Sequence, residues 1–201
     1  MTLPSGILLA AFAAAALSLG RARLGIGSVR VRRFAPRAGD AGAGVRYAFT
    51  AAFLPWAKES ASAHVVSYLA GVLYHAGIFT MLICLLLSLA APQAPPALAG
   101  ALAVVFGAAL AAGVGLFVKR LFDVALRAVS VPDDFLANLL VDAALAAALA
   151  AALVPGAAFV FQLTGAALLL YAPVGKLRHM LFLVTSRRLW GAYYGRRGVL
   201  P

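Results

Sequence analysis

The sequence predicts an all-α integral membrane protein: a bundle of five transmembrane helices, with the N-terminus outside and the C-terminus in the cytoplasm. Three observations lead to this prediction. Of the 201 residues, 64% are hydrophobic and only 11% are charged, whereas soluble domains carry about 25% charged residues. The apolar residues gather in five long runs. All the basic residues lie on one side of those runs.

The five runs are long enough to cross a bilayer, whose ~30 Å hydrocarbon core needs about 20 helical residues. Proline and glycine separate the second run from the third and the fourth from the fifth, and Pro132-Asp133-Asp134 is typical of a helix start. We therefore expect one membrane domain over residues 1–201. Its helices are expected at roughly residues 3–20, 62–91, 97–118, 135–154 and 157–180.

The orientation follows from the 17 Lys and Arg residues. They lie in the loop of residues 21–60, between the third and fourth runs, and after the fifth run, with none in the two opposite loops. The positive-inside rule places these basic segments, including the tail of residues 181–201, in the cytoplasm. Basic residues follow the first apolar run and none precedes it, which is the reverse of a signal peptide, so we expect a retained helix.

The composition also excludes some classes of function. The net charge of +11 could indicate nucleic acid binding. The basic residues, however, alternate with apolar runs as topological anchors do, so we expect the lipid bilayer as partner and no nucleic acid. The single cysteine, Cys84, excludes a disulfide framework and a thiolate metal cluster.

The three histidines are the candidate ligands. His64 and His75 fall in the second run and His179 at the cytoplasmic end of the fifth. A lone histidine in a membrane helix more often forms a structural hydrogen bond to another helix than it ligates a cofactor. Here a glycine, Gly71 or Gly175, precedes two of the histidines by four residues, which leaves room for a flat macrocycle on that face. Glycines are also common at plain helix crossings.

Two axial side chains hold haem iron in an electron-transfer site, so histidines on two helices predict a haem b site. Depth does not select the pair. His75 lies ~24 Å from the outer end of its helix, His179 ~33 Å and His64 ~40 Å, so His179 falls between the other two.

Two segments resemble a known family. Leu73–Phe79, LYHAGIF, looks like the start of the haem-binding second helix in the gamma subunit of respiratory nitrate reductase. Tyr171–His179, YAPVGKLRH, looks like the end of the fifth helix of that family. Related (DsrM-like) membrane cytochrome b subunits serve heterodisulfide-reductase-like and sulfite-reduction complexes.

The resemblance implies that His75 and His179 ligate one b haem near the cytoplasm. The second haem pair of the family would fall near Leu85 and Phe161, which cannot ligate iron, so we expect a single haem b. It further implies electron transfer between menaquinone or ubiquinone and a cytoplasmic iron–sulfur subunit, in a bacterial or archaeal cytoplasmic membrane. The alternative is a membrane anchor or assembly subunit without a cofactor. A small transporter is less consistent with the few buried polar groups.

Other residues are candidates with open alternatives. His64 is an alternative axial ligand, a contact of a quinone, a propionate or a partner protein, or an interfacial helix-start histidine. Asp142, a carboxylate inside an apolar helix, is either a proton or quinone site or an ion-pair partner of an arginine. The spacing of Gly107, Ala111 and Gly115 predicts a packing seam. The candidate partners for haem propionates are Arg21, Arg23, Lys176 and Arg178.

Overall fold

Four apolar helices are long enough to cross a membrane, as the hydrophobic runs predict. They are α1 (Leu3–Gly25), α4 (Val65–Leu87), α5 (Pro96–Phe122) and α7 (Pro132–Leu153). The computed structural model describes residues 3–25, 38–57, 59–91, 93, 95–154 and 156–200. Over this part of the chain the secondary structure is helical and contains no strand. By length and composition, these four helices are consistent with a multi-pass membrane protein.

The helix boundaries follow the signals in the sequence. Pro96 and Pro132 each occupy the first position of their helix, where the missing N–H of proline removes no intrahelical bond. At the start of α7 the Asp134 carboxylate accepts a hydrogen bond from the backbone N–H of Val131 at 2.9 Å. The helix start predicted at Pro132-Asp133-Asp134 is therefore confirmed.

The fifth apolar run differs from the expected single helix. It forms α8 (Ala158–Tyr171), a 3-10 turn η3 (Lys176–Arg178) and then α9 (His179–Gly195). Pro173 cannot donate a backbone hydrogen bond, and the Tyr171 carbonyl accepts bonds from Val174 and Gly175 instead. Helix α8 has 14 residues, ~21 Å, which alone is shorter than a bilayer core.

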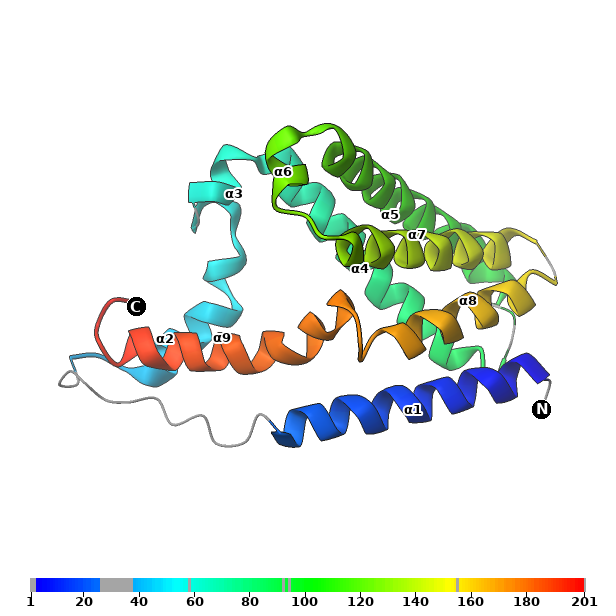
Figure 1. Cartoon of the computed structure of the whole chain (residues 1–201), viewed down its shortest axis with the longest axis horizontal. Coiled ribbons are helices and arrows are strands. Elements are labelled where there is room, and N and C mark those ends of the chain that lie inside the picture. Colours follow the sequence, from blue (N-terminus) through cyan, green and yellow to red (C-terminus); the bar gives the residue numbers. More distant parts are fainter. Residues whose placement is uncertain are drawn as a thin grey trace. The chain divides into compact units, whose positions relative to one another are not determined.

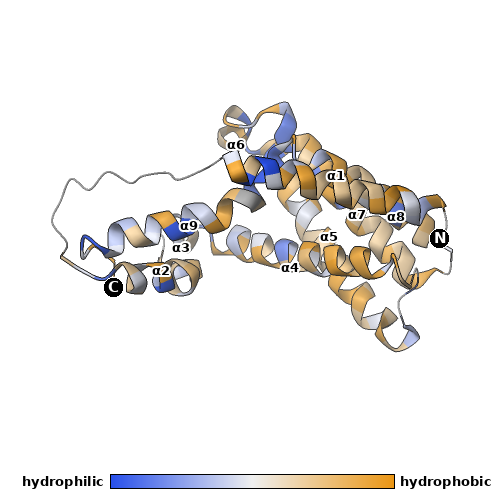
Figure 2. Ribbon diagram, turned by 90° about the horizontal axis from the view of Figure 1, so that it is seen from below, coloured by the Kyte–Doolittle hydropathy of each residue, from blue (hydrophilic) through white to orange (hydrophobic). Residues whose placement is uncertain are grey.

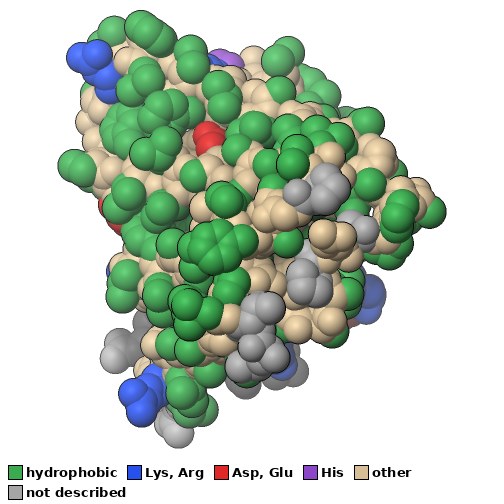
Figure 3. Space-filling view, turned by 90° about the vertical axis from the view of Figure 1, so that its right-hand side faces the viewer, with side chains coloured by type: hydrophobic (Ala, Val, Ile, Leu, Met, Phe, Trp, Pro, Cys, Tyr) green, Lys and Arg blue, Asp and Glu red, His purple; other side chains and the backbone are tan. Residues whose placement is uncertain are grey.

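The chain divides into two compact units, each of which is described by itself. Unit 1 comprises Met1–Ser18 and Leu69–Leu177, and unit 2 comprises Leu19–Tyr68 and Arg178–Pro201. In unit 1, α7 packs between α5 and α8 (Figure 1). Figure 2 shows that hydrophobic residues dominate these helices along their length. Figure 3 shows hydrophobic side chains distributed across the face in view, interspersed with backbone and other side chains.

Helix α5 contacts its neighbours through a seam other than the predicted one. Apart from the adjoining backbone of α5, no atom of the described residues lies within 4 Å of a β-carbon built on Gly107 or Gly115. The tight positions are Ala109, which meets Gly77 of α4, and Gly113. The seam prediction was wrong because α5 offers small residues on several faces, and spacing alone does not select the face that packs.

Unit 2 is built on two helices that touch backbone to backbone. Helix α2 (Ala41–Phe49) packs against α9. A β-carbon on Gly44 would lie 2.2 Å from the Gly191 carbonyl oxygen, and one on Gly195 would lie 2.5 Å from the Asp40 carbonyl oxygen. Glycines at positions 44, 191 and 195 therefore permit the close approach. The tail expected after residue 180 is thus mostly helix.

Short elements complete both units. Unit 2 also contains the 3-10 turns η1 (Ala51–Phe53) and η2 (Pro55–Ala57) and helix α3 (Glu59–Ala63). Unit 1 contains α6 (Val124–Ala128), whose N-cap is Asp123. At the start of α2, the Asp40 carboxylate accepts from the N–H groups of Gly42 and Ala43 at 2.8 and 3.1 Å. These bonds lower the pKa of the exposed Asp40 carboxyl from its ordinary value.

Candidate functional site

A buried polar cluster joins three helices of unit 1. We define the Asp142 cluster as Asp142 and Asn138 of α7 with Tyr74 of α4. The Tyr74 hydroxyl donates to Asp142 Oδ1 at 2.7 Å, and the Asn138 amide donates to Asp142 Oδ2 at 2.7 Å. Gly113 of α5 lies against both side chains: its β-carbon would be 2.3 Å from Asp142 Oδ1 and 2.4 Å from the Tyr74 ring. The absence of a side chain at Gly113 makes room for the cluster.

The Asp142 carboxyl has only neutral partners. It is 8% exposed, and no ion pair joins it to a basic residue in the part of the chain that the structure describes. The possible salt bridge to an arginine of the rim is therefore not formed with any arginine in the described part of the chain. A carboxylate among apolar membrane helices without a cation is unfavourable unless it is hydrogen bonded or protonated. The geometry favours the reading of Asp142 as a proton site.

His75 is adjacent to Tyr74 but lies on the exposed face of α4 rather than in the core. Its Nδ1 lies 2.7 Å from the Gly71 carbonyl oxygen. Because a carbonyl only accepts, Nδ1 donates, and in the neutral imidazole the lone pair lies on Nε2. Ligating histidines commonly donate their other ring N–H to a backbone carbonyl in this way. Apart from the adjoining backbone of α4, no atom of the described chain lies within 4 Å of a β-carbon built on Gly71, so His75 and its glycine suit an axial ligand.

His179 differs from that expectation. It is the first residue of α9, and the turn at 172–175 and η3 precede it, so Gly175 is not one helical turn before it on a common face. The space beside Gly175 is filled: its β-carbon would lie 2.1 Å from Cζ of the Tyr171 ring. The glycine gap predicted for His179 is therefore absent. His179 belongs to unit 2 and His75 to unit 1, and their pairing stays a prediction.

His64 interrupts the second apolar run. It lies between α3 and α4, and its backbone N–H donates to the Ala61 carbonyl at 3.2 Å. The side chain is exposed. This position is that of a histidine at a helix start, one of the three readings that the sequence left open.

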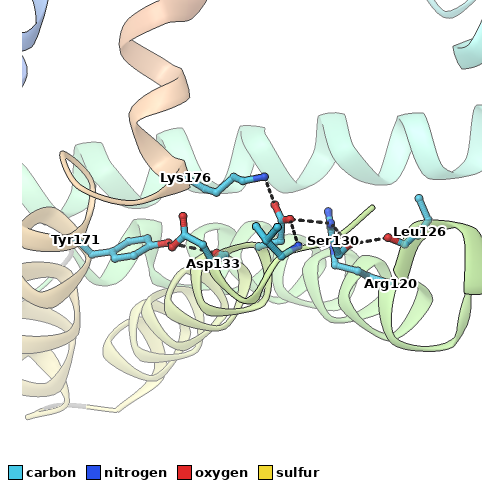
Figure 4. A network of polar contacts seen from close by, with 8 residues as sticks. Arg120, Leu126, Ser130, Asp133, Tyr171 and Lys176 are labelled. Carbon is cyan, nitrogen blue, oxygen red and sulfur yellow. Dashed lines mark hydrogen bonds and ion pairs between the residues drawn. The ribbon is translucent and has the colours of Figure 1, made fainter. Parts of the chain in front are cut away.

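A second polar cluster ties the start of α7 to the end of α8 (Figure 4). Asp134 Oδ1 lies 2.8 Å from Lys176 Nζ, and Asp134 Oδ2 lies 3.9 Å from Arg120 Nη1. Asp133 accepts from the Tyr171 hydroxyl. Lys176, a candidate partner for a propionate, is thus engaged by a carboxylate, whereas the candidates Arg21, Arg23 and Arg178 are exposed.

A third polar cluster, around Gln162 of α8, is neutral and buried. The Gln162 amide donates to the Ser88 carbonyl at 2.9 Å and accepts from the Ser5 hydroxyl of α1 at 3.4 Å.

Leu85 marks the position where the second haem of the resembled family would be ligated. It packs on Gly165, whose β-carbon would lie 2.4 Å from Leu85 Cδ1. Leu85 and Phe161 are both buried in the core. Apolar packing fills this region of unit 1.

Sequence reasoning found Asp142 but missed its partners. Asn138 stands four residues before it, which places both on one helical face, and this signal was available. The sequence does not show whether Tyr74 or its neighbour His75 points inward, because this depends on the rotation of α4 about its axis. No protein-family model, curated protein or solved structure matches this chain. The resemblance of the two histidine segments therefore stays a prediction.

Proposed function

We propose that this chain is a haem b-containing membrane subunit that transfers electrons between membrane quinone, menaquinone or ubiquinone, and a cytoplasmic iron–sulfur oxidoreductase partner. The observation on which the proposal rests is the geometry at His75. The bond from Nδ1 to the Gly71 carbonyl fixes the ring and leaves the lone pair on Nε2, and Gly71 leaves open space on the same face. A bound haem supplies one-electron transfer.

The proposed topology has five crossings, with the N-terminus outside and the C-terminus in the cytoplasm. Helices α1, α4, α5 and α7 supply four. The fifth consists of α8 together with the turn and η3, because the 14 residues of α8 alone are too short. This arrangement keeps every basic segment on one side of the membrane, which supports an odd number of crossings.

The proposed ligands are His75 and His179, with His64 as the alternative to His75. The packed core at Leu85 and Phe161 supports one haem rather than two. The exposed guanidinium groups of Arg21, Arg23 and Arg178 would hold the haem propionates. The basic residues of α9 and its end, among them Arg187, Arg188, Arg196 and Arg197, would contribute to the surface that binds the cytoplasmic partner.

A reduced-minus-oxidised visible spectrum of the purified full chain, expressed with haem available, tests the proposal. We expect one b-type band, lost in His75→Ala and in His179→Ala and retained in His64→Ala, with the helical circular dichroism unchanged in all three. A well-folded preparation without the band would refute the haem assignment. A band that survives His75→Ala and disappears in His64→Ala would move the ligand to His64.

The second candidate is a membrane anchor or assembly subunit without a cofactor. One observation favours it: the ring of Tyr171 fills the gap that was expected beside His179. The bond between His75 and Gly71 also stabilises a histidine that only faces lipid or a partner helix. The two candidates differ in two measurements. An anchor without a cofactor gives no b-type band. It also binds its partner with the same affinity in the His75→Ala and His179→Ala variants as in the parent chain.

A further inference from the structure

The Asp142 cluster satisfies its hydrogen bonds in two protonation states. When Asp142 is ionised, its two oxygens accept from the Tyr74 hydroxyl and the Asn138 amide, each at 2.7 Å. When Asp142 is protonated on Oδ1, it becomes a donor, and the Tyr74 oxygen, 2.7 Å away, accepts the hydrogen bond from the carboxyl O–H. The Tyr74 hydroxyl hydrogen then needs another acceptor.

That acceptor is already in place. The Asn138 backbone carbonyl oxygen lies 3.5 Å from the Tyr74 hydroxyl oxygen, at the outer limit of a hydrogen bond. A carbonyl has two lone pairs, so it can accept this bond in addition to its helical one. Protonation of Asp142 thus reverses one hydrogen bond and turns one hydroxyl, without moving a heavy atom to a new partner. The cluster is built to hold either zero or one proton.

The groups around the carboxyl do not fix its charge. Helix α5 brings Lys119 and Arg120, and α7 brings Asp133 and Asp134, but among the described residues the bonds of Asp142 go to Tyr74 and Asn138. Arg120 pairs with Asp134 instead. On α4 the titratable neighbour of Tyr74 is His75, which lies on the exposed face. Among the described residues, the bonded partners of Asp142 include no cation that would hold the carboxyl permanently ionised.

We propose that Asp142 is the proton-binding residue of a membrane-buried site, with Tyr74 as its exchange partner and Asn138 as the group that orients it. The step is uptake of one proton from hydronium by the carboxylate, which gives the neutral acid and water. The structure of the cluster supports this inference whether or not the chain binds haem. In a redox subunit the same uptake would neutralise part of the charge of an added electron.

Infrared difference spectroscopy of the full chain in lipid nanodiscs tests the site. We expect the carbonyl band of a protonated carboxylic acid, shifted in deuterium oxide, which disappears as pH rises. It should be absent in Asp142→Asn and shifted in frequency in Asp142→Glu, whereas Tyr74→Phe should move its titration midpoint. Asp40→Asn removes an exposed carboxyl of unit 2 and should leave the band unchanged.

Three results would overturn the proposal. One is the absence of a protonated-acid band at every pH at which the parent chain keeps its helical circular dichroism, since Asp142 would then stay ionised. Another is a band that persists unchanged in both Asp142 variants. The last is a titration midpoint that is identical in Tyr74→Phe and the parent chain. This result would show that the Tyr74 hydroxyl has no part in proton binding by Asp142. The parent spectrum alone decides the first point if a variant does not fold.

Discussion

Gly113 and Gly107 lie on the same helix, α5, and the structure predicts opposite effects for the same substitution to alanine. A β-carbon on Gly113 would lie 2.3 Å from Asp142 Oδ1 and 2.4 Å from the Tyr74 ring, both far inside van der Waals contact. At Gly107, apart from the adjoining backbone of α5, no atom of the described residues lies within 4 Å of the new carbon. The pair separates packing against the Asp142 cluster from the general effect of removing a glycine from a helix.

The two substitutions are expected to change the free energy of unfolding in opposite directions. Replacing a helical glycine by alanine gains about 0.5–1 kcal/mol from propensity, which is all that we expect at Gly107. At Gly113 the extra carbon overpacks the core, at about 1–3 kcal/mol, and separates Tyr74 from Asp142, which loses about 0.5–1.5 kcal/mol more. After subtraction of the propensity gain, Gly113→Ala should destabilise the chain by about 0.5–4 kcal/mol.

Reversible unfolding of the full chain in mixed micelles with a rising fraction of dodecyl sulfate measures both variants, with circular dichroism as the signal. Gly113→Ala should unfold at a lower fraction of dodecyl sulfate than the parent, and Gly107→Ala at the same or a higher fraction. Gly115→Ala, also in open space, is a second control. Equal stability of Gly113→Ala and Gly107→Ala would refute the packing of α5 on the Asp142 cluster.

Three further effects are expected. Gly191→Ala should raise amide hydrogen exchange throughout α2, because the new carbon meets the Gly44 backbone, 2.5 Å away at its oxygen, and backbone cannot rotate aside; protected α2 amides would contradict this contact. Leu85→Ala should destabilise the chain by about 2–5 kcal/mol in the micelle titration, since Leu85 is fully buried; a loss below about 1 kcal/mol would mean that the core at this site is loose. The lowered pKa of Asp40 means that its cap stabilises α2 fully above the ordinary carboxyl pKa of about 3.9 and is lost as pH falls through the lowered value. The protection of the α2 amides, measured as the exchange rate relative to an unstructured peptide at the same pH, should therefore fall in that acid range. In Asp40→Asn, which caps without titrating, this protection should not change there; a loss of protection that remains in the variant would assign the effect to another group.

The membrane helices could be predicted because apolar length and proline position decide them. Four of the predicted runs became α1, α4, α5 and α7, and their ends follow helix-start and helix-stop signals. The fifth run could not be predicted as well. Hydropathy continues through Tyr171 into the basic tail, but Pro173 interrupts the hydrogen bonding, and the break separates α8 from α9. Hydropathy measures transfer to lipid and contains no information on this break.

The candidate site could be predicted only in part, because a partner on another helix depends on rotation about the helix axis. Asp142 is conspicuous as a carboxylate in an apolar run, and its helical neighbour Asn138 follows from spacing. Tyr74 and His75 are 100° apart on α4, and sequence favoured the histidine, whereas the tyrosine faces the core. Gly113 was passed over for Gly107 and Gly115 for the same reason.

The contact between α2 and α9 sets the order in which the protein is completed. Gly44 and Gly191 lie near opposite ends of the chain yet touch through their backbones. During synthesis α2 emerges long before α9. The glycine face of α2 therefore has no packing partner while the apolar helices between them are made. Unit 2 closes only when the last helix is made. A chain that ends before α9 would thus keep its apolar helices and still leave α2 without its packing partner.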